Sequence, residues 1–202
     1  MHKAWVGQRV ICRGAMGART TRAWFLHHYY EHECGPFRNL SDLAQEAAEA
    51  VQRRLKERGD VFASRRSDDY LAIRRQLEER ARELFIFKGG EPARARPHYM
   101  TLGACEWIRQ WYREGREVKL RVDEFDPRAV SFTYGDLFPT MRCGDGRPYR
   151  GQVYTRDEIF QLIDEYGLPQ DWNRDGSQGP ERYIEAQIWD DAPLARFLPE
   201  SV

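Results

Sequence analysis

The stretch Arg182-Tyr-Ile-Glu-Ala-Gln-Ile-Trp189 alternates strictly between two sets of side chains. Successive side chains of an extended chain point to opposite faces, so this alternation predicts a strand. One face would carry Ile184, Ala186 and Ile188 toward the core. The other would carry Glu185, beside Tyr183, Gln187 and Trp189. Solvent-facing polarity on an antiparallel sheet is the plain interpretation of that second face, and a ligand site is the alternative.

Four other segments have strand patterns, at residues 7–13, 97–101, 117–123 and 129–134. The segment 117–123 alternates apolar and basic residues, which is typical of a half-buried strand. The pair Asp126-Pro127 predicts a turn that leads into the segment 129–134. We therefore expect the strands at 117–123 and 129–134 to be antiparallel neighbours.

Apolar residues at helical spacing predict helices near 41–58, 67–86, 102–114 and 155–166. The last of these begins with Thr155-Arg-Asp-Glu158, which has the form of a capping box. Thr20 or Thr21 can also cap a helix over the aromatic-rich stretch that Gly35-Pro36 ends. Residues 168–181 are rich in Gly, Pro, Asp and Asn, and we expect a loop there.

Together these elements predict one α+β domain over residues 1–202, with a mixed and largely antiparallel sheet. The sheet-rich part would span 97–198, and residues 36–96 would form an inserted helical segment. This segment belongs to the same domain because Gly59-Asp60 and Gly89-Gly90 are turns too short to be linkers. A chain of 202 residues with 41% hydrophobic residues is long enough for one core.

Composition argues against several classes of protein. No window approaches about 18 consecutive apolar residues, and the first residues lack an apolar stretch followed by a small-residue cleavage site. We therefore expect no membrane partner and a cytoplasmic location. The four cysteines are widely spaced, which favours reduced thiols over a disulfide framework. They are Cys12, Cys34, Cys105 and Cys143.

One histidine-rich stretch raises the possibility of a zinc site. It contains His27, His28, His32 and Cys34, and a helix would place His28 and His32 on one face. No second cluster of ligands completes four-coordination, so we expect no metal.

Charge is unevenly distributed, although the chain has 32 basic and 32 acidic residues. Basic residues exceed acidic ones in 51–96, and acidic residues exceed basic ones in 151–202. In the basic segment, arginines alternate with aromatic residues, a pattern that favours nucleic-acid binding. The candidate residues are Arg65, Arg66, Arg74 and Arg75. Salt bridges along solvent-exposed helix faces are the alternative explanation.

Four segments have the order found in a known fold. They are a strand that ends in Arg13-Gly14, the segment His98-Tyr-Met-Thr101 before a helix, Ser131-Phe-Thr133 after a strand pair, and the Glu185 strand followed by residues 190–194. This order resembles the ADP-ribosyltransferase fold, specifically its branch of DNA-modifying toxins and RNA 2′-phosphotransferases. The resemblance implies that NAD is the substrate and that the acceptor of ADP-ribose is a nucleic acid or a protein.

The resemblance also implies roles for individual residues. Glu185 would be the catalytic residue, ionised at neutral pH, and would stabilise the oxocarbenium-like centre that forms when the N-glycosidic bond breaks. Ser131 and Thr133 would frame the nicotinamide pocket. The residues that would bind NAD are Arg13, His98, Tyr99, Thr101, Ser131 and Thr133.

Two functions without catalysis are alternatives. The first is nucleic-acid binding through the arginine-rich helical segment. The second is a protein-interaction module that uses the aromatic side chains of Trp5, Trp24, Phe25, Tyr29 and Tyr30.

Overall fold

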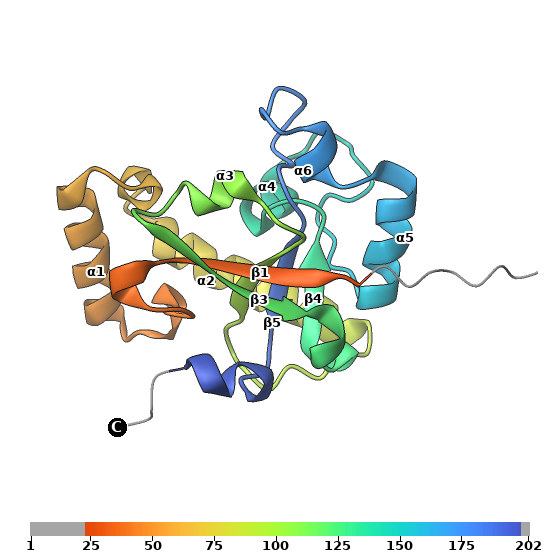
Figure 1. The fold of residues 1–202 in the computed structure, drawn as a ribbon, viewed down its shortest axis with the longest axis horizontal. Coiled ribbons are helices and arrows are strands. Elements are labelled where there is room, and N and C mark those ends of the chain that lie inside the picture. The colour runs from red at the N-terminus through yellow and green to blue at the C-terminus, as the bar shows by residue number, and fades with distance from the viewer. Residues whose placement is uncertain (1–22, 199–202) are drawn as a thin grey trace, which may run out of the picture.

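The computed structural model describes residues 23–198. These residues form one α+β domain in which helices flank a single sheet (Figure 1). The strand predicted at 7–13, together with Arg13 and Cys12, lies outside the described residues.

The sheet has five strands in the described part of the chain, and every pairing between them is antiparallel. Their order is β3-β1-β2-β5-β4. The strands are β1 (Phe25–Glu31), β2 (His98–Leu102), β3 (Gly115–Arg121), β4 (Val130–Thr133) and β5 (Glu185–Ile188). The strands predicted at 97–101, 117–123, 129–134 and 182–189 are confirmed to within a few residues.

Strand β1 corrects the prediction of a helix capped by Thr20 or Thr21. Its 7 residues pair with β3 along their whole length, and two of them also pair with β2. Its sequence, FLHHYYE, is rich in aromatic side chains, which favour strands because they pack well on a pleated surface. Ladders on both sides therefore outweigh the capping signal.

Strands β3 and β4 are the two edges of the sheet, so the prediction that they are neighbours is wrong. Two short 3-10 helices, Val122–Glu124 and Pro127–Ala129, lie between them in the chain. Asp126 caps the second of these, accepting a hydrogen bond from the N–H of Arg128 at 2.9 Å. A turn marks a change of direction but does not select the partner strand, and consecutive strands are only usually adjacent.

Two long helices lie between β1 and β2, where we predicted an inserted helical segment. Helix α1 spans Gln45–Arg58 and ends at Gly59, whose φ of 69° is the left-handed conformation that glycine adopts easily. Helix α2 spans Tyr70–Phe87. In Figure 1, α1 lies at the left end of the sheet and α2 passes behind the strands. Because α2 packs Phe85 against Trp189, it belongs to the body of the domain.

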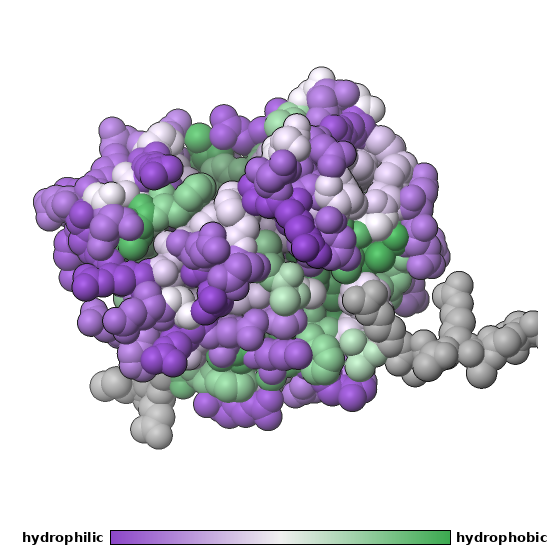
Figure 2. Space-filling view, turned by 45° about the horizontal axis from the view of Figure 1, so that its top comes forward, coloured by the Kyte–Doolittle hydropathy of each residue, from purple (hydrophilic) through white to green (hydrophobic). Residues whose placement is uncertain are grey.

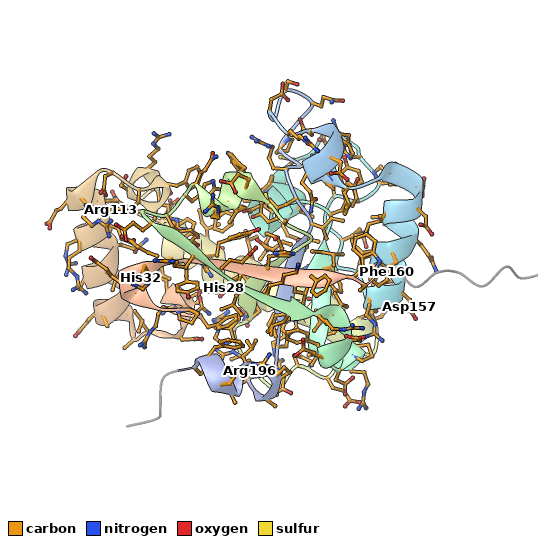
Figure 3. The ribbon with its side chains drawn as sticks, viewed as in Figure 1. His28, His32, Arg113, Asp157, Phe160 and Arg196 are labelled. Atoms are coloured by element: carbon orange, nitrogen blue, oxygen red, sulfur yellow. The ribbon has the colours of Figure 1, made fainter. Side chains whose placement is uncertain are left out.

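Helix α5 (Arg156–Tyr166) lies at the other end of the sheet (Figure 1). It begins with the predicted capping box, formed by Thr155 and Glu158. Phe160 of this helix, labelled in Figure 3, contacts the ring of Trp24 just before β1. The ring centroids are 5.3 Å apart. Three short helices complete the set in residues 23–198: α3 (Glu106–Arg109), α4 (Leu137–Arg142) and α6 (Pro169–Trp172). Helix α6 lies where we predicted only a loop.

Helix α3 is much shorter than the helix predicted at 102–114. Before it, Leu102 belongs to β2, and Cys105 is extended with its N–H donating to the phenol oxygen of Tyr29 at 2.8 Å. After it, Trp111 stacks on Phe62 with ring centroids 3.9 Å apart. Tertiary contacts at both ends thus override helix propensity.

The two faces of the sheet are both covered. One face packs into the main core, which contains Leu26, Met100, Phe132 and Ala186 together with Ile159 of α5. The opposite face carries Glu185 and is covered in part by α2. All four residues of β5 are buried, so the solvent-facing interpretation of this strand is wrong.

The face of the molecule shown in Figure 2 is mostly hydrophilic, and hydrophobic residues form separate patches on it. Within residues 23–198, no helix has both the length and the apolar composition needed to cross a membrane. The described cysteines, Cys34, Cys105 and Cys143, are free thiols.

Candidate functional site

Four side chains form a row across the second face of the sheet. Glu185 of β5 pairs directly with Thr101 of β2 and with Thr133 of β4. Thr101 pairs in turn with His27 of β1. Paired residues of antiparallel strands point to the same face, so these side chains lie side by side. The row places one carboxyl group between two threonines in the interior of the sheet.

A cavity of about 730 Å³ lies between three members of this row, His27, Thr101 and Glu185, and the helical segment. Its size is within the range of small-molecule and cofactor sites. The polar residues that line it include His27, Tyr99, Thr101, Asp136, Tyr183 and Glu185. Tyr70 of α2 and Phe138 of α4 also line it, and their rings stack with centroids 5.0 Å apart. Of the residues predicted for the NAD site, the structure therefore brings His98, Tyr99, Thr101 and Glu185 to one cavity.

Two neighbours hold the Glu185 carboxyl group. Gln187 Nε2 donates to Glu185 Oε1 at 3.1 Å, and the phenol oxygen of Tyr183 lies 3.3 Å from Glu185 Oε2. The same phenol oxygen lies 2.8 Å from Oδ2 of Asp136. One phenol therefore bridges two carboxyl groups, and all three side chains line the cavity.

A hydrogen-bonded chain behind Glu185 orients Gln187. Gln187 Nε2 also donates to Thr133 Oγ1 at 3.1 Å, and the Ser131 hydroxyl donates to Gln187 Oε1 at 2.8 Å. Trp189 Nε1 donates to Ser131 Oγ at 2.8 Å. Ser131 and Thr133 are fully buried and are not among the residues that line the cavity. They therefore reach a ligand only through Gln187 and Glu185.

Burial raises the pKa of Glu185 well above its usual range, and the negative charge of Asp136 raises it further. Hydrogen bonds from Gln187 and Tyr183, and the charge of Arg74, lower this pKa, but by less. Protonation of Glu185 is thus favoured relative to an exposed carboxyl group, and its pKa differs from the ordinary value that the sequence suggested.

Tyr99 connects the sheet to α2. Its hydroxyl donates to Oε1 of Glu78 at 2.9 Å, and the same oxygen accepts hydrogen bonds from the Ser41 hydroxyl and from Arg74 Nε, both at 2.8 Å. The Arg74 guanidinium also lies over the Tyr99 ring, 4.6 Å from its centroid. Because Glu78 is fully buried, this network anchors α2 and the 3-10 helix Leu40–Asp42 to the sheet.

The four arginines predicted to bind nucleic acid divide into two pairs. Arg74 is held by the buried carboxylate of α2, and Arg75 donates two hydrogen bonds near the start of α1. Arg66 lines the cavity, with its guanidinium 4.3 Å from the centroid of the Tyr70 ring. Arg65 is exposed beside it. Arg66 and Arg74 therefore line the cavity, Arg74 with its guanidinium held by Glu78, whereas Arg65 and Arg75 are not among the lining residues.

His28 and His98 both line the cavity and also have structural partners. His28 Nδ1 lies 2.9 Å from the carbonyl oxygen of Tyr99, and its Nε2 accepts a hydrogen bond from the N–H of Phe37 at 2.9 Å. Burial lowers the pKa of His28 to about 4, so the ring is neutral and carries its proton on Nδ1. His98 pairs with Asp191 at 2.9 Å, on the face of β2 opposite Tyr99.

The stretch that suggested zinc is β1 followed by the 3-10 helix His32–Cys34, and not one continuous helix. Both ring nitrogens of His28 already have hydrogen-bond partners. Figure 3 labels His28 and His32. Among residues 23–198, no group of three or more His, Cys, Asp or Glu side chains is arranged to hold a metal ion.

No protein-family model, curated protein or solved structure matches this chain.

Asp136 and Glu78 were not singled out from the sequence. Asp136 follows Gly135 and has the composition of a turn residue. The sequence does contain a signal for Glu78. This residue interrupts an apolar stripe on one helix face, which it shares with Leu71, Ala81 and Phe85. A carboxylate within such a stripe needs a buried partner.

Proposed function

We propose that the protein transfers ADP-ribose from NAD to a nucleic-acid or protein acceptor, with Glu185 as the catalytic residue. The position of Glu185 carries this proposal. It lies between Thr101 and Thr133 in the interior of an antiparallel sheet and lines a cavity of about 730 Å³. The order of sequence segments that resembles the ADP-ribosyltransferase fold leads to the same residue.

The chemistry requires a negative charge at a fixed place. When the bond between ribose and nicotinamide breaks, its electron pair stays on the nicotinamide nitrogen and positive charge builds on the anomeric carbon. A carboxylate held beside that carbon by Gln187 and Tyr183 stabilises this charge without reorganising. The nicotinamide of NAD is itself cationic, and a nearby cation lowers the pKa of a carboxyl group. NAD binding would therefore favour the ionised form of Glu185.

Other parts of the cavity suit the rest of NAD. The stacked rings of Tyr70 and Phe138 provide an aromatic surface for a base. Arg66 lies on the Tyr70 side of this stack, where its guanidinium can pair with phosphate oxygens. Thr101 Oγ1 donates to the carbonyl of Gly103 at 2.7 Å, so its oxygen offers lone pairs to a ligand hydroxyl.

Labelled NAD tests the proposal directly. Wild type and Glu185→Gln would be incubated with labelled NAD and with single-stranded DNA, RNA or lysate protein as acceptors. We expect the variant to bind NAD and remain folded, but to lose about 10³-fold in turnover. Glu79→Gln, an exposed position on α2, is the matched control. No NAD binding to wild type at millimolar concentration, or equal label transfer by Glu185→Gln, would refute the assignment.

Nucleic-acid binding without catalysis is the second candidate, and the position of Arg65 and Arg66 supports it. An exposed arginine and an arginine on an aromatic ring suit a single strand whose bases stack. A steep salt dependence of binding whose slope falls by about one in Arg65→Ala and is unaffected by Glu185→Gln would favour this function.

A further inference from the structure

We propose that Asp136 is a second catalytic residue, the general base that takes the proton from the acceptor as the acceptor attacks the ribose. This inference rests on the proposed function of the cavity. It follows from the two carboxyl groups that one phenol bridges in the cavity wall.

The geometry gives the two oxygens of Asp136 separate tasks. Oδ1 accepts a hydrogen bond from the N–H of Phe138 at 2.8 Å, which fixes the orientation of the carboxylate. Oδ2 lies 2.8 Å from the phenol oxygen of Tyr183, on the side of Glu185. Asp136, Tyr183 and Glu185 all line the cavity, so Oδ2 lies near the place where the reaction would occur.

The two carboxyl groups are electrostatically unequal. Two negative charges this close repel each other, so each charge disfavours the other. Burial and the charge of Asp136 raise the pKa of Glu185, so protonation of Glu185 is favoured relative to an exposed carboxyl group. Arg74, Gln187 and the phenols of Tyr99 and Tyr183 also interact with Glu185. A cationic nicotinamide would then favour ionisation of Glu185, with loss of its proton to solvent.

Glycosyl transfer commonly uses two carboxyl groups with different tasks. The acceptor oxygen or nitrogen forms a bond to the anomeric carbon, and the bond from that carbon to nicotinamide breaks. Its electron pair leaves with nicotinamide, which becomes neutral. The acceptor proton passes to Asp136 and from there to solvent. Glu185 stabilises the positive charge on the ribose and accepts no proton in this step.

The competing role for Asp136 is structural, because it caps α4 and holds Tyr183. Asp136→Asn separates the two roles. The amide oxygen keeps the cap to Phe138, and the amide keeps a polar partner for Tyr183, but it takes up no proton at neutral pH. Azide is a suitable probe because it attacks as an anion and has no proton to lose. Attack by azide therefore needs no general base. Azide cannot repair a misplaced Tyr183.

Nicotinamide release from NAD would be measured for wild type, Asp136→Asn and Glu185→Gln, with water as the acceptor and then with sodium azide. Sodium chloride at the same concentration is the control. We expect Asp136→Asn to be about 100-fold slower than wild type in water. Azide should restore its rate and yield ADP-ribosyl azide, identified by mass, whereas Glu185→Gln stays slow in both. NAD affinity and melting temperature should stay close to wild type in Asp136→Asn.

The outcomes separate this inference from the proposed function. If wild type neither binds nor cleaves NAD, both the proposed function and the role of Asp136 are refuted. If Glu185→Gln is inactive but Asp136→Asn keeps the wild-type rate, only the role of Asp136 is overturned. A slow Asp136→Asn variant that azide does not restore also overturns it and leaves Asp136 as a structural residue.

Discussion

Thr101 and Glu185 are directly paired across β2 and β5, and both side chains line the cavity on the same face of the sheet. Neither strand is at an edge, so both are held by ladders on two sides. Functional groups on such strands are positioned more accurately than groups on loops. The pairing therefore places a carboxyl group and a hydroxyl oxygen at a fixed spacing, and burial of this pair has consequences for stability as well as for chemistry.

Glu185→Gln should stabilise the protein, increasingly so at higher pH. The pKa of Glu185 is raised in the folded state, so the folded state binds more protons between the unfolded and folded pKa values. Wild-type stability therefore falls as the pH rises through this window, and glutamine removes that titration. Thermal denaturation at pH 5 and pH 8 should show a larger advantage of the variant at pH 8. A difference that is independent of pH would contradict this prediction.

Glu78→Gln should destabilise the protein by about 3 to 5 kcal/mol, because it leaves the charge of Arg74 without its buried partner. It also weakens the hydrogen bonds from Ser41 and Tyr99. Urea denaturation would measure the loss. Glu83→Gln is the control, because Glu83 forms an exposed pair on the same helix and should contribute little. Equal midpoints for the two variants would show that the network does not anchor α2.

Ser131→Ala should reduce stability by about 1 to 3 kcal/mol. The substitution leaves Trp189 Nε1 and Gln187 Oε1 without their partner, and both side chains are fully buried. Ser177→Ala, at an exposed position in the loop after α6, should change the free energy of unfolding little. Chemical denaturation of the two variants provides the comparison. Retention of wild-type stability in Ser131→Ala would indicate that water replaces the hydroxyl.

The protein should lose stability as the pH falls from about 6.5 toward 4, in part because of His28. The pKa of His28 is lowered to about 4 by burial, so the unfolded state binds its proton first. The lowering of the His28 pKa from its usual value to about 4 corresponds to about 3 kcal/mol of unfolding free energy. His98, whose pKa burial also lowers, acts in the same direction. Free energies of unfolding at pH 7 and pH 5 should show a smaller loss in His28→Gln than in wild type.

The control for this pH dependence is His32→Gln, because His32 is exposed. This variant should lose as much stability as wild type between pH 7 and pH 5. If His28→Gln and His32→Gln follow the same profile, His28 is not the source of the acid sensitivity.

Local sequence determined much of the secondary structure. The alternation around Glu185, the capping box at Thr155 and the apolar spacing in 41–58 and 67–86 each specify an element, because periodicity and caps act within a few residues. The same alternation assigned Glu185 to the face opposite Ile184 and Ile188. The sequence thus determined that Glu185 and Thr101 lie on strands, and on which face of its strand Glu185 lies.

Tertiary structure alone decided what covers that face. Strand order placed β3 and β4 at opposite edges and made β1 an inner strand, since pairing depends on partners distant in the chain. Helix α2 and the α4 segment then enclosed Glu185 and brought Asp136 next to it through Tyr183. The pKa of Glu185 follows from this enclosure, because desolvation and the charge of Asp136 act through space and have no local sequence signature.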